Sequence, residues 1–184
     1  MIVVATVVAF VGYPASGKSE AARMAVELGI PVVCMGDVVR GEAQVQGLEP
    51  RDDVLGGLAS EMRKVEGMDA IARRCLASVE EKLAQHGVVV VDGIRGIAEV
   101  RFFRQELGTQ FRLVHIHSPF ELRLVRNLTR GRSDVLPTRE QLELRDERER
   151  GWGLDEAIEM ADERVSNEGS LEQLRQRVRG VLVG

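Results

Sequence analysis

Residues 12–19 of this 184-residue chain fit the pattern G-x-x-x-x-G-K-[ST]. The glycines of such a loop allow backbone conformations closed to other residues, so successive N–H groups point into one concavity that suits phosphates. Lys18 then reaches the β- and γ-phosphates of a nucleotide, and the Ser19 hydroxyl is a ligand for Mg²⁺. The residues predicted to bind the nucleotide in this loop are Gly12, Tyr13, Pro14, Ala15, Ser16, Gly17, Lys18 and Ser19.

The segments on both sides of the loop also constrain the fold. An apolar run at 2–11 precedes it, and a helix-like stretch at 18–28 follows it. A strand, a glycine loop and a helix N-terminus together form an anion site, because unpaired N–H groups and the helix dipole add to the donors of the loop. The alternative is an ordinary glycine turn between core elements. The combination of loop and flanks predicts a bound nucleotide.

Strand-like and helix-like segments alternate along the whole chain. Apolar runs at 2–11, 30–35, 88–91 and 111–117, with a brief strand near 164–166, are nearly continuous, as expected of parallel strands covered on both faces. The pattern predicts one doubly wound α/β domain over 1–184, with a parallel sheet of about five strands flanked by helices. The helical patterns between the runs cover 21–28, 52–64, 69–85, 97–107, 120–130, 138–150, 154–161 and 171–182.

Composition narrows the classes of partner. The chain is 44% apolar and 29% charged, with a net charge of −4 and a pI near 5.5. These values suit a cytoplasmic protein and disfavour a general nucleic-acid binder, which is usually basic. Two cysteines imply no disulfide framework. The apolar start lacks a positive n-region and a small-residue cleavage site, and no other run reaches transmembrane length, so no membrane partner is expected.

A carboxylate follows the third apolar run. Asp92 comes directly after the valines at 88–91 and before Gly93. Ligands of open α/β sheets gather at the carboxyl ends of strands, so we expect Asp92 near the Mg²⁺ that Ser19 contacts. The alternative is an aspartate that only initiates a turn before glycine.

Two arginines are expected at the same mouth of the sheet. Asp37 is at a plausible N-cap after the second run, and Arg40 follows one turn into the helix. Arg40 and Arg95 then suit a clamp on the phosphate or carboxylate of an acceptor, because a guanidinium binds two anionic oxygens at once. The alternative is that both arginines are exposed charges paired with Glu42 or Glu99.

Arginines are dense in the stretch from residue 120 to residue 150. Arg126 and Arg130 are four residues apart and share one helix face, with Arg123 one turn earlier. One interpretation is a solvated, salt-bridged helix pair. The other is a mobile lid that closes over the triphosphate, excludes water and brings arginines to the phosphoryl group. The remaining arginines of the stretch are Arg132, Arg139, Arg145, Arg148 and Arg150.

Three further side chains are interpreted as structural. His115 and His117 share one face of the fourth run, and we expect them to be partly buried and hydrogen-bonded rather than metal-bound. Trp152, between two glycines, is interpreted as a packing anchor at a hinge rather than a base-stacking residue.

With these residues identified, the chain resembles the P-loop nucleoside-monophosphate-kinase superfamily, and more closely the archaeal UPF0200 family, described as adenylate-kinase-related or dephospho-CoA-kinase-like. The resemblance covers nearly the whole chain in the family's order. The matching segments are 12–19, Met-Gly-Asp-Val-Val-Arg (35–40), Val-Asp-Gly-Ile-Arg (91–95), Arg-Gly-Arg-Ser-Asp (130–134), Arg-Asp-Glu-Arg-Glu (145–149), Ala-Asp (161–162) and Asn-Glu-Gly-Ser (167–170).

The resemblance implies a P-loop NTPase three-layer sandwich with an acceptor-binding helical region at about 36–86 and an arginine-rich lid at about 120–150. It implies that Asn167 lies in a loop that approaches adenine. Adenylate kinases usually follow the strand-end Asp-Gly with an aromatic residue, Pro and Arg. Here Ile94-Arg95-Gly96 stands instead, which argues against a simple AMP acceptor. The lid lacks a cysteine quartet, so no structural zinc is expected there.

The sequence therefore predicts an ATP- and Mg²⁺-dependent phosphotransferase that is a monomer or homodimer and acts on a small nucleotide or nucleotide-like acceptor. One alternative is a nucleotide-dependent regulatory ATPase or switch without such an acceptor, and another is a binding module without catalysis. The residues predicted to take part in catalysis are Lys18, Asp37 (the candidate base), Arg126, Arg130 and Arg145; those for the acceptor are Arg40 and Arg95; those for the metal are Ser19 and Asp92.

Overall fold

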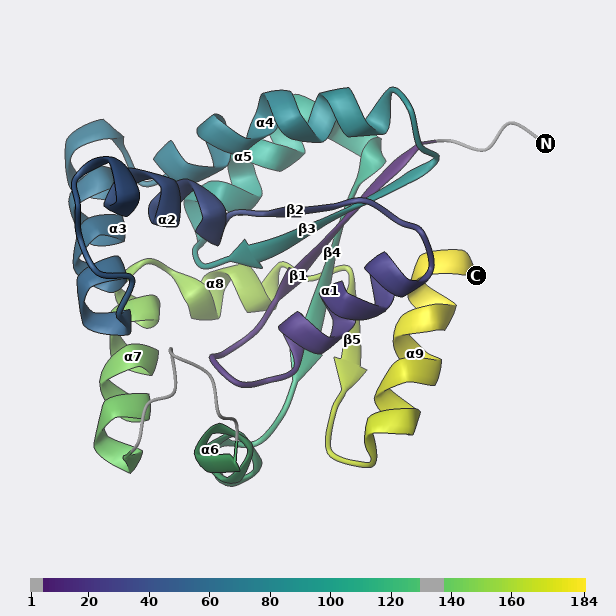
Figure 1. Ribbon diagram of the computed structural model, residues 1–184. Helices are drawn as coiled ribbons and strands as arrows, with labels where there is room; N and C mark the ends of the chain where they lie inside the picture. The colour runs from purple at the N-terminus through teal and green to yellow at the C-terminus, as the bar shows by residue number, and fades with distance from the viewer. Residues whose placement is uncertain (1–4, 130–137) are drawn as a thin grey trace.

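The computed structural model describes residues 5–129 and 138–184, and these ranges form a parallel sheet between layers of helices (Figure 1). The sheet order in these ranges is β2-β3-β1-β4-β5, and every neighbouring pair is parallel. The predicted parallel sheet of about five strands is confirmed. The strands are β1 (Thr6–Val11), β2 (Val32–Cys34), β3 (Val88–Ile94), β4 (Phe111–His117) and β5 (Glu163–Ser166).

The helices follow the predicted segments closely. Each helical pattern in the sequence corresponds to one helix, and α2 is the helix expected after the second strand. The helices are α1 (Lys18–Glu27), α2 (Gly36–Val45), α3 (Asp52–Glu66), α4 (Ala70–Leu83), α5 (Ile97–Leu107), α6 (Phe120–Thr129), α7 (Arg139–Gly151), α8 (Leu154–Glu159) and α9 (Leu171–Val183), with a 3₁₀ turn, η1 (Gly108–Gln110).

Two strands are shorter than predicted. Part of the first apolar run, residues 1–4, lies outside the described residues, and β1 begins at Thr6. The second strand was predicted over 30–35 but spans Val32–Cys34 only. The N–H of Ile30 donates instead to the carbonyl of Ala25, 2.8 Å away, so Ile30 belongs to the end of α1.

The core has two halves, one on each face of the sheet. Alternate residues of β1 point to opposite faces, as the pleat of a strand requires. Val8 and Phe10 pack with the layer of α1 and α9, whereas Val7, Ala9 and Val11 pack with α4, α5 and α8. All five side chains are almost fully buried. Covering both faces explains why the strands read as continuous apolar runs.

The carboxyl edge of the sheet carries the loops that matter below. β1 leads into residues 12–17 and α1, while Asp92, two residues before the end of β3, pairs with Cys34 at the end of β2. Helices α3 and α7 approach each other beside this edge, with α6 below it in the view of Figure 1. No helix of the described ranges is long and apolar enough to cross a bilayer.

Candidate active site

The phosphate-type loop adopts the backbone conformation that its sequence predicts. Gly12, Ala15 and Gly17 have φ values of 154°, 61° and 116°. A Cβ at residue 12 would lie 2.4 Å from the carbonyl oxygen of Ile116, so only glycine fits where the loop crosses the end of β4. The Ser16 hydroxyl is buried, and its oxygen has no hydrogen-bond partner among the described residues.

Lys18 points back into this loop. Its side chain is buried, and the ammonium donates to the carbonyl of Tyr13 at 2.9 Å and to that of Gly12. Burial and, to a lesser extent, the neighbouring Arg95 cation lower the pKa of Lys18 to about 7. A polyphosphate beside the ammonium would favour the charged form, because opposite charges within a few ångströms stabilise each other.

Asn167 braces the loop from the other side. The resemblance implies that the loop of this residue approaches adenine. In the structure the side-chain amide of Asn167 is buried and donates to the carbonyl of Ser16 at 2.8 Å. A Cβ on Gly17 would lie 2.4 Å from this amide nitrogen. Arg126, one of the predicted catalytic arginines, donates to the carbonyl of Asn167 at 2.9 Å and to the Ser118 hydroxyl at 3.0 Å. Both side chains thus stabilise the junction of β5 with the loop.

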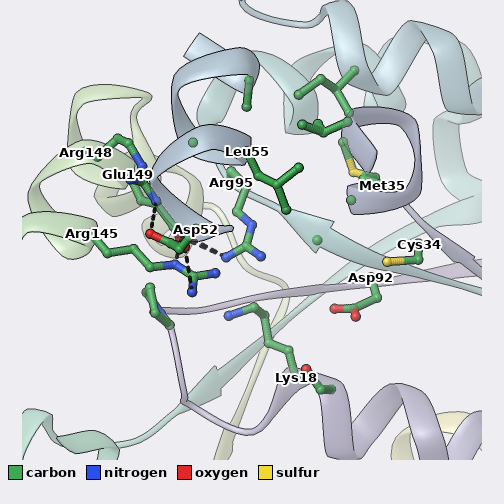
Figure 2. Close-up of a pocket in the computed structure, with 18 of the residues that line it drawn as sticks. Lys18, Cys34, Met35, Asp52, Leu55, Asp92, Arg95, Arg145, Arg148 and Glu149 are labelled. Carbon is green, nitrogen blue, oxygen red and sulfur yellow. Dashed lines mark hydrogen bonds and ion pairs between the residues drawn. The ribbon is translucent and has the colours of Figure 1, made fainter. Parts of the chain in front are cut away.

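One cavity of about 500 Å³ opens in front of the loop, between α2, α3 and α7 (Figure 2). Its apolar side is formed by residues of α2, α3 and α4, among them Val39, Leu55, Ala59 and Ile71. The cavity brings together most of the predicted site residues. Those that line it are Pro14, Ala15, Ser16, Gly17, Lys18, Ser19, Arg40, Asp92, Arg95 and Arg145.

A network of alternating charges faces Lys18 across the cavity (Figure 2). Arg95 donates to both carboxylate oxygens of Glu149, at 2.9 and 3.0 Å, and Arg145 donates to Glu149 at 3.3 Å. Arg145 and Arg148 both bind Asp52, at 3.1 and 3.0 Å. These five residues are here named the arginine wall. Neither Asp52 nor Glu149 is assigned a function from the sequence, although Glu149 ends the family segment at 145–149.

The charges of the wall stabilise one another. Burial alone would raise the pKa of Glu149, but Arg95, Arg145 and Lys18 outweigh it and lower this pKa to about 2. Burial opposes the charged form of Arg95 as well, yet Glu149 and Asp92 raise its pKa overall. Glu149 is therefore ionised at neutral pH and serves as a fixed hydrogen-bond acceptor for two guanidiniums.

A tight turn fixes Arg95 at the end of β3. The Glu99 carboxylate accepts from the backbone N–H of Arg95 at 2.7 Å and of Gly96 at 3.2 Å, and it binds the buried Arg63 at 2.6 Å. A Cβ on Gly96 would lie 2.1 Å from the carbonyl oxygen of Trp152, so this position requires glycine. The alternative predicted for Arg95, an exposed charge paired with Glu42 or Glu99, differs from the structure: Glu99 binds only its backbone N–H, and the guanidinium, 26% exposed, binds Glu149.

The prediction for Asp37 needs correction. The cap position of α2 is Met35, and Asp37 lies inside the first turn without making a side-chain cap. Its carboxylate binds Arg40 at 2.6 Å, because residues three apart share a helix face. The Asp37 side chain is 70% exposed and does not line the cavity, whereas Arg40 does and also contacts the Cys34 sulfur at 3.2 Å. Asp37 is therefore poorly placed to act as a base.

Arg123 has a structural position. Both of its terminal nitrogens bind Asp146 of α7, at 3.0 and 2.7 Å, and one also donates to the carbonyl of Pro14 at 3.0 Å. Both charged side chains are buried, and the Arg123 guanidinium lies 4.9 Å from the ring centre of Tyr13. This part of the arginine-rich stretch matches the salt-bridged helix pair. Arg130 and Arg132 lie outside the described residues.

The two histidines lie in β4, and Trp152 lines the cavity. His115 and His117 are 5.5 Å apart between ring centres, and burial, with His117 nearby, lowers the pKa of His115 to about 4. Within the described ranges, no group of three or more acidic, histidine or cysteine side chains is arranged to hold a metal ion. The Trp152 ring packs against Arg63, 4.1 Å away, and Arg148, 5.7 Å away.

The chain is similar in sequence to a domain family and to several archaeal proteins. The model of the AAA domain family matches residues 11–143. A UPF0200/UPF0201 protein of Archaeoglobus fulgidus is 54% identical over 183 residues, which cover 100% of this chain and 57% of the relative. A UPF0200 protein of Methanosarcina acetivorans is 51% identical over 176 residues, covering 96% of this chain and 93% of the relative. The chain thus spans little more than half of the first relative and nearly all of the second.

Solved structures with the same fold include two kinases and a protein without a functional name. TT1252 from Thermus thermophilus has a TM-score of 0.61 at 18% identity, covering 97% of this chain and 96% of that one. Shikimate kinase from Acinetobacter baumannii in complex with shikimate has a TM-score of 0.57 at 18% identity, with 96% and 92% covered. A gluconokinase from Sinorhizobium meliloti 1021 has a TM-score of 0.56 at 18% identity, with 95% and 89% covered. At these identities the likeness concerns the fold.

Proposed function

The chain belongs to the UPF0200 family and has the P-loop kinase-like fold, and we propose that it transfers the γ-phosphoryl group of ATP to a small nucleotide or nucleotide-like acceptor. The observation that carries this proposal is the shared cavity of the phosphate loop and the arginine wall. A site that only binds a nucleotide would need the phosphate loop but not the arginine wall. A transferase also needs cationic groups on the far side, where the phosphoryl group meets its acceptor.

The loop supplies the nucleotide half of the site. Its positive-φ backbone, the buried Ser16 hydroxyl and the Lys18 ammonium together fit a polyphosphate. Ser19 and Asp92 line the same cavity and are the residues that would hold Mg²⁺. When bound, this ion neutralises negative charge on the phosphate oxygens.

The arginine wall supplies the transfer half. Lys18 orients the end of the triphosphate, and Arg145 and Arg95 stabilise the charge that spreads over the phosphoryl oxygens during transfer. Arg40 and Arg95 bind the anionic group of the acceptor against the apolar side formed by α2 and α3. Such a reaction depends on positioning and charge neutralisation more than on covalent chemistry by the protein.

Three parts of the proposal rest on the family resemblance. Residues 36–86 would form the acceptor region and residues 120–150 the lid, all within one domain. Arg126 and Arg130 would contact the nucleotide when the lid closes. The acidic composition supports work on a small molecule in the cytoplasm rather than on nucleic acid.

A coupled assay for ADP release tests the proposal. Nucleoside monophosphates and dephospho-CoA are supplied one at a time with MgATP, beside a control without acceptor. ADP formed only with one acceptor supports the phosphotransferase. ADP formed equally without any acceptor favours the regulatory ATPase instead, and no ADP under any condition contradicts both.

A further inference from the structure

One carboxylate joins the helices on two sides of the cavity. Asp52 is the first residue of α3, and its two oxygens bind two arginines of α7. We propose that Asp52 is a positioning residue, which holds Arg145 and Arg148 beside the phosphate loop when α3 is in place. This inference rests on the proposed function, because it assigns how the transfer half of that site is assembled.

The geometry of Asp52 suits this role. One carboxylate oxygen lies 3.1 Å from Arg145 and the other 3.0 Å from Arg148, so the acid fixes two guanidiniums that are one turn apart on α7. The three side chains are only 18%, 16% and 26% exposed. Charge pairs shielded from water in this way are stronger and better ordered than surface pairs.

The backbone of α3 is adapted to the same contact. Gly56 lies one turn after Asp52, and a Cβ there would lie 2.4 Å from the central carbon of the Arg148 guanidinium. Arg148 therefore lies flat against the helix where no side chain intervenes. This glycine is an independent sign that α3 accommodates Arg148, since glycine inside a helix is less stable than alanine.

The contact also links the acceptor side to the wall. Helix α3 lines the cavity with Leu55, Gly56 and Ala59, so an acceptor that fills the cavity would contact this helix. Arg145 and Arg95 both bind Glu149, so a shift of Asp52 that moves Arg145 would also affect the contact of Arg95. The arginines then lie in the productive position only while α3 is docked. Such coupling favours transfer to an acceptor over transfer to water.

The test replaces Asp52 by the isosteric amide and compares it with a neighbour. Asp53 lies in the same turn, is 73% exposed and contacts only Arg51, at 3.4 Å, among the described residues, so Asp53→Asn is the matched control. With the acceptor found in the assay above, Asp52→Asn should lower kcat about 30-fold while the KM for ATP stays within about twofold. Asp52→Glu, which keeps the charge, should recover most of kcat.

Equal kcat values for Asp52→Asn and the wild type, or an equal loss in Asp53→Asn, would overturn the proposal. So would a loss that appears entirely in the KM for ATP, because that would place Asp52 in nucleotide binding. Failure of Asp52→Glu to exceed Asp52→Asn would also contradict it, since the role requires the charge.

A second readout needs no acceptor and therefore survives failure of the proposed function. Trp152 is the single tryptophan of the chain, and Arg148 lies over its ring. When Arg148 loses Asp52, we expect acrylamide to quench Trp152 fluorescence about twice as strongly. Asp53→Asn should match the wild type. Unchanged quenching in Asp52→Asn would show that Asp52 does not hold Arg148.

Gly56→Ala provides a variant that leaves the carboxylate intact. Its methyl group would displace Arg148 from α3, so it should raise the quenching of Trp152 in the same direction. Circular dichroism checks that each variant is folded, and Gly56→Ala replaces Asp52→Asn if the latter is not. A folded Gly56→Ala protein with wild-type quenching of Trp152 would contradict the proposed position of Arg148 against Gly56.

Discussion

The two halves of the cavity are built from different materials. The phosphate-loop half consists of consecutive residues fixed to the central strand, and it offers backbone groups with one ammonium. The arginine wall consists of side chains from α3, α7 and the end of β3, held in place by Asp52 and Glu149. Substitutions change the backbone groups of the phosphate loop very little, whereas they directly change the side chains of the arginine wall. The loop thus suits an invariant polyphosphate, and the wall suits a particular acceptor.

Arg123 is a joint between these halves. It connects the loop carbonyl of Pro14 with Asp146 of α7, one turn before the wall residue Glu149. The comparison therefore predicts three classes of substitution: those that destroy function through the loop, those that loosen the joint, and those that weaken only the wall.

The largest effect is expected in the loop. Lys18→Ala removes the ammonium that would bridge the phosphate oxygens, so phosphoryl transfer should fall by at least about 10³-fold. The fold should survive, because burial disfavours the charged form of Lys18, as its pKa of about 7 shows. Removing the side chain should therefore cost little stability. The coupled assay measures the first effect, and thermal unfolding followed by circular dichroism measures the second. Wild-type turnover of the Lys18→Ala variant would show that Lys18 takes no part in phosphoryl transfer.

The next effect is expected at the joint. Arg123→Met leaves Asp146 buried without its partner, which should lower the free energy of unfolding by about 3 kcal/mol. Arg139→Met is the control, since its pair with Glu121 is 45% and 71% exposed and should contribute little to stability. Urea unfolding measures both. Equal stability of the two variants would mean that Arg123 is not a structural joint.

A smaller effect is expected in the wall. Arg145→Gln removes the charge and shortens the side chain while keeping a polar end, and kcat should fall about 10²-fold with the protein still folded. Arg139→Gln on the same helix should stay within about twofold. Steady-state kinetics with the preferred acceptor decides between them. An unchanged kcat for Arg145→Gln would leave the wall with a structural role only.

The sequence predicts the loop half and the sheet because their information is local. The phosphate loop is one unbroken motif, and Asp92 and Arg95 lie at the carboxyl end of a strand that must end beside this loop. Asp52 and Glu149 could not be found in this way. Asp52 is 93 residues from Arg145 in the sequence, and pairing them depends on how α3 and α7 pack.

Local patterns also misplaced some residues. Asp37 reads as a helix cap, but α2 begins one residue earlier and the carboxylate pairs with Arg40. Arg123 and Arg145 look alike in the sequence, and only burial against Asp146 separates a structural arginine from one that lines the cavity. Charge patterns on helices show which residues share a face but do not show what lies opposite them.

The central claim, that the loop with Lys18 binds a triphosphate, is tested most directly by calorimetry with MgATP at pH 8 in two buffers of different ionisation enthalpy. At this pH a lysine with a pKa of about 7 is mostly neutral, and the triphosphate should return it to the charged form. We expect one nucleotide to bind with uptake of about one proton, and this uptake to be lost in Lys18→Ala. Absence of heat with both ATP and GTP, or the same uptake in Lys18→Ala, would contradict it.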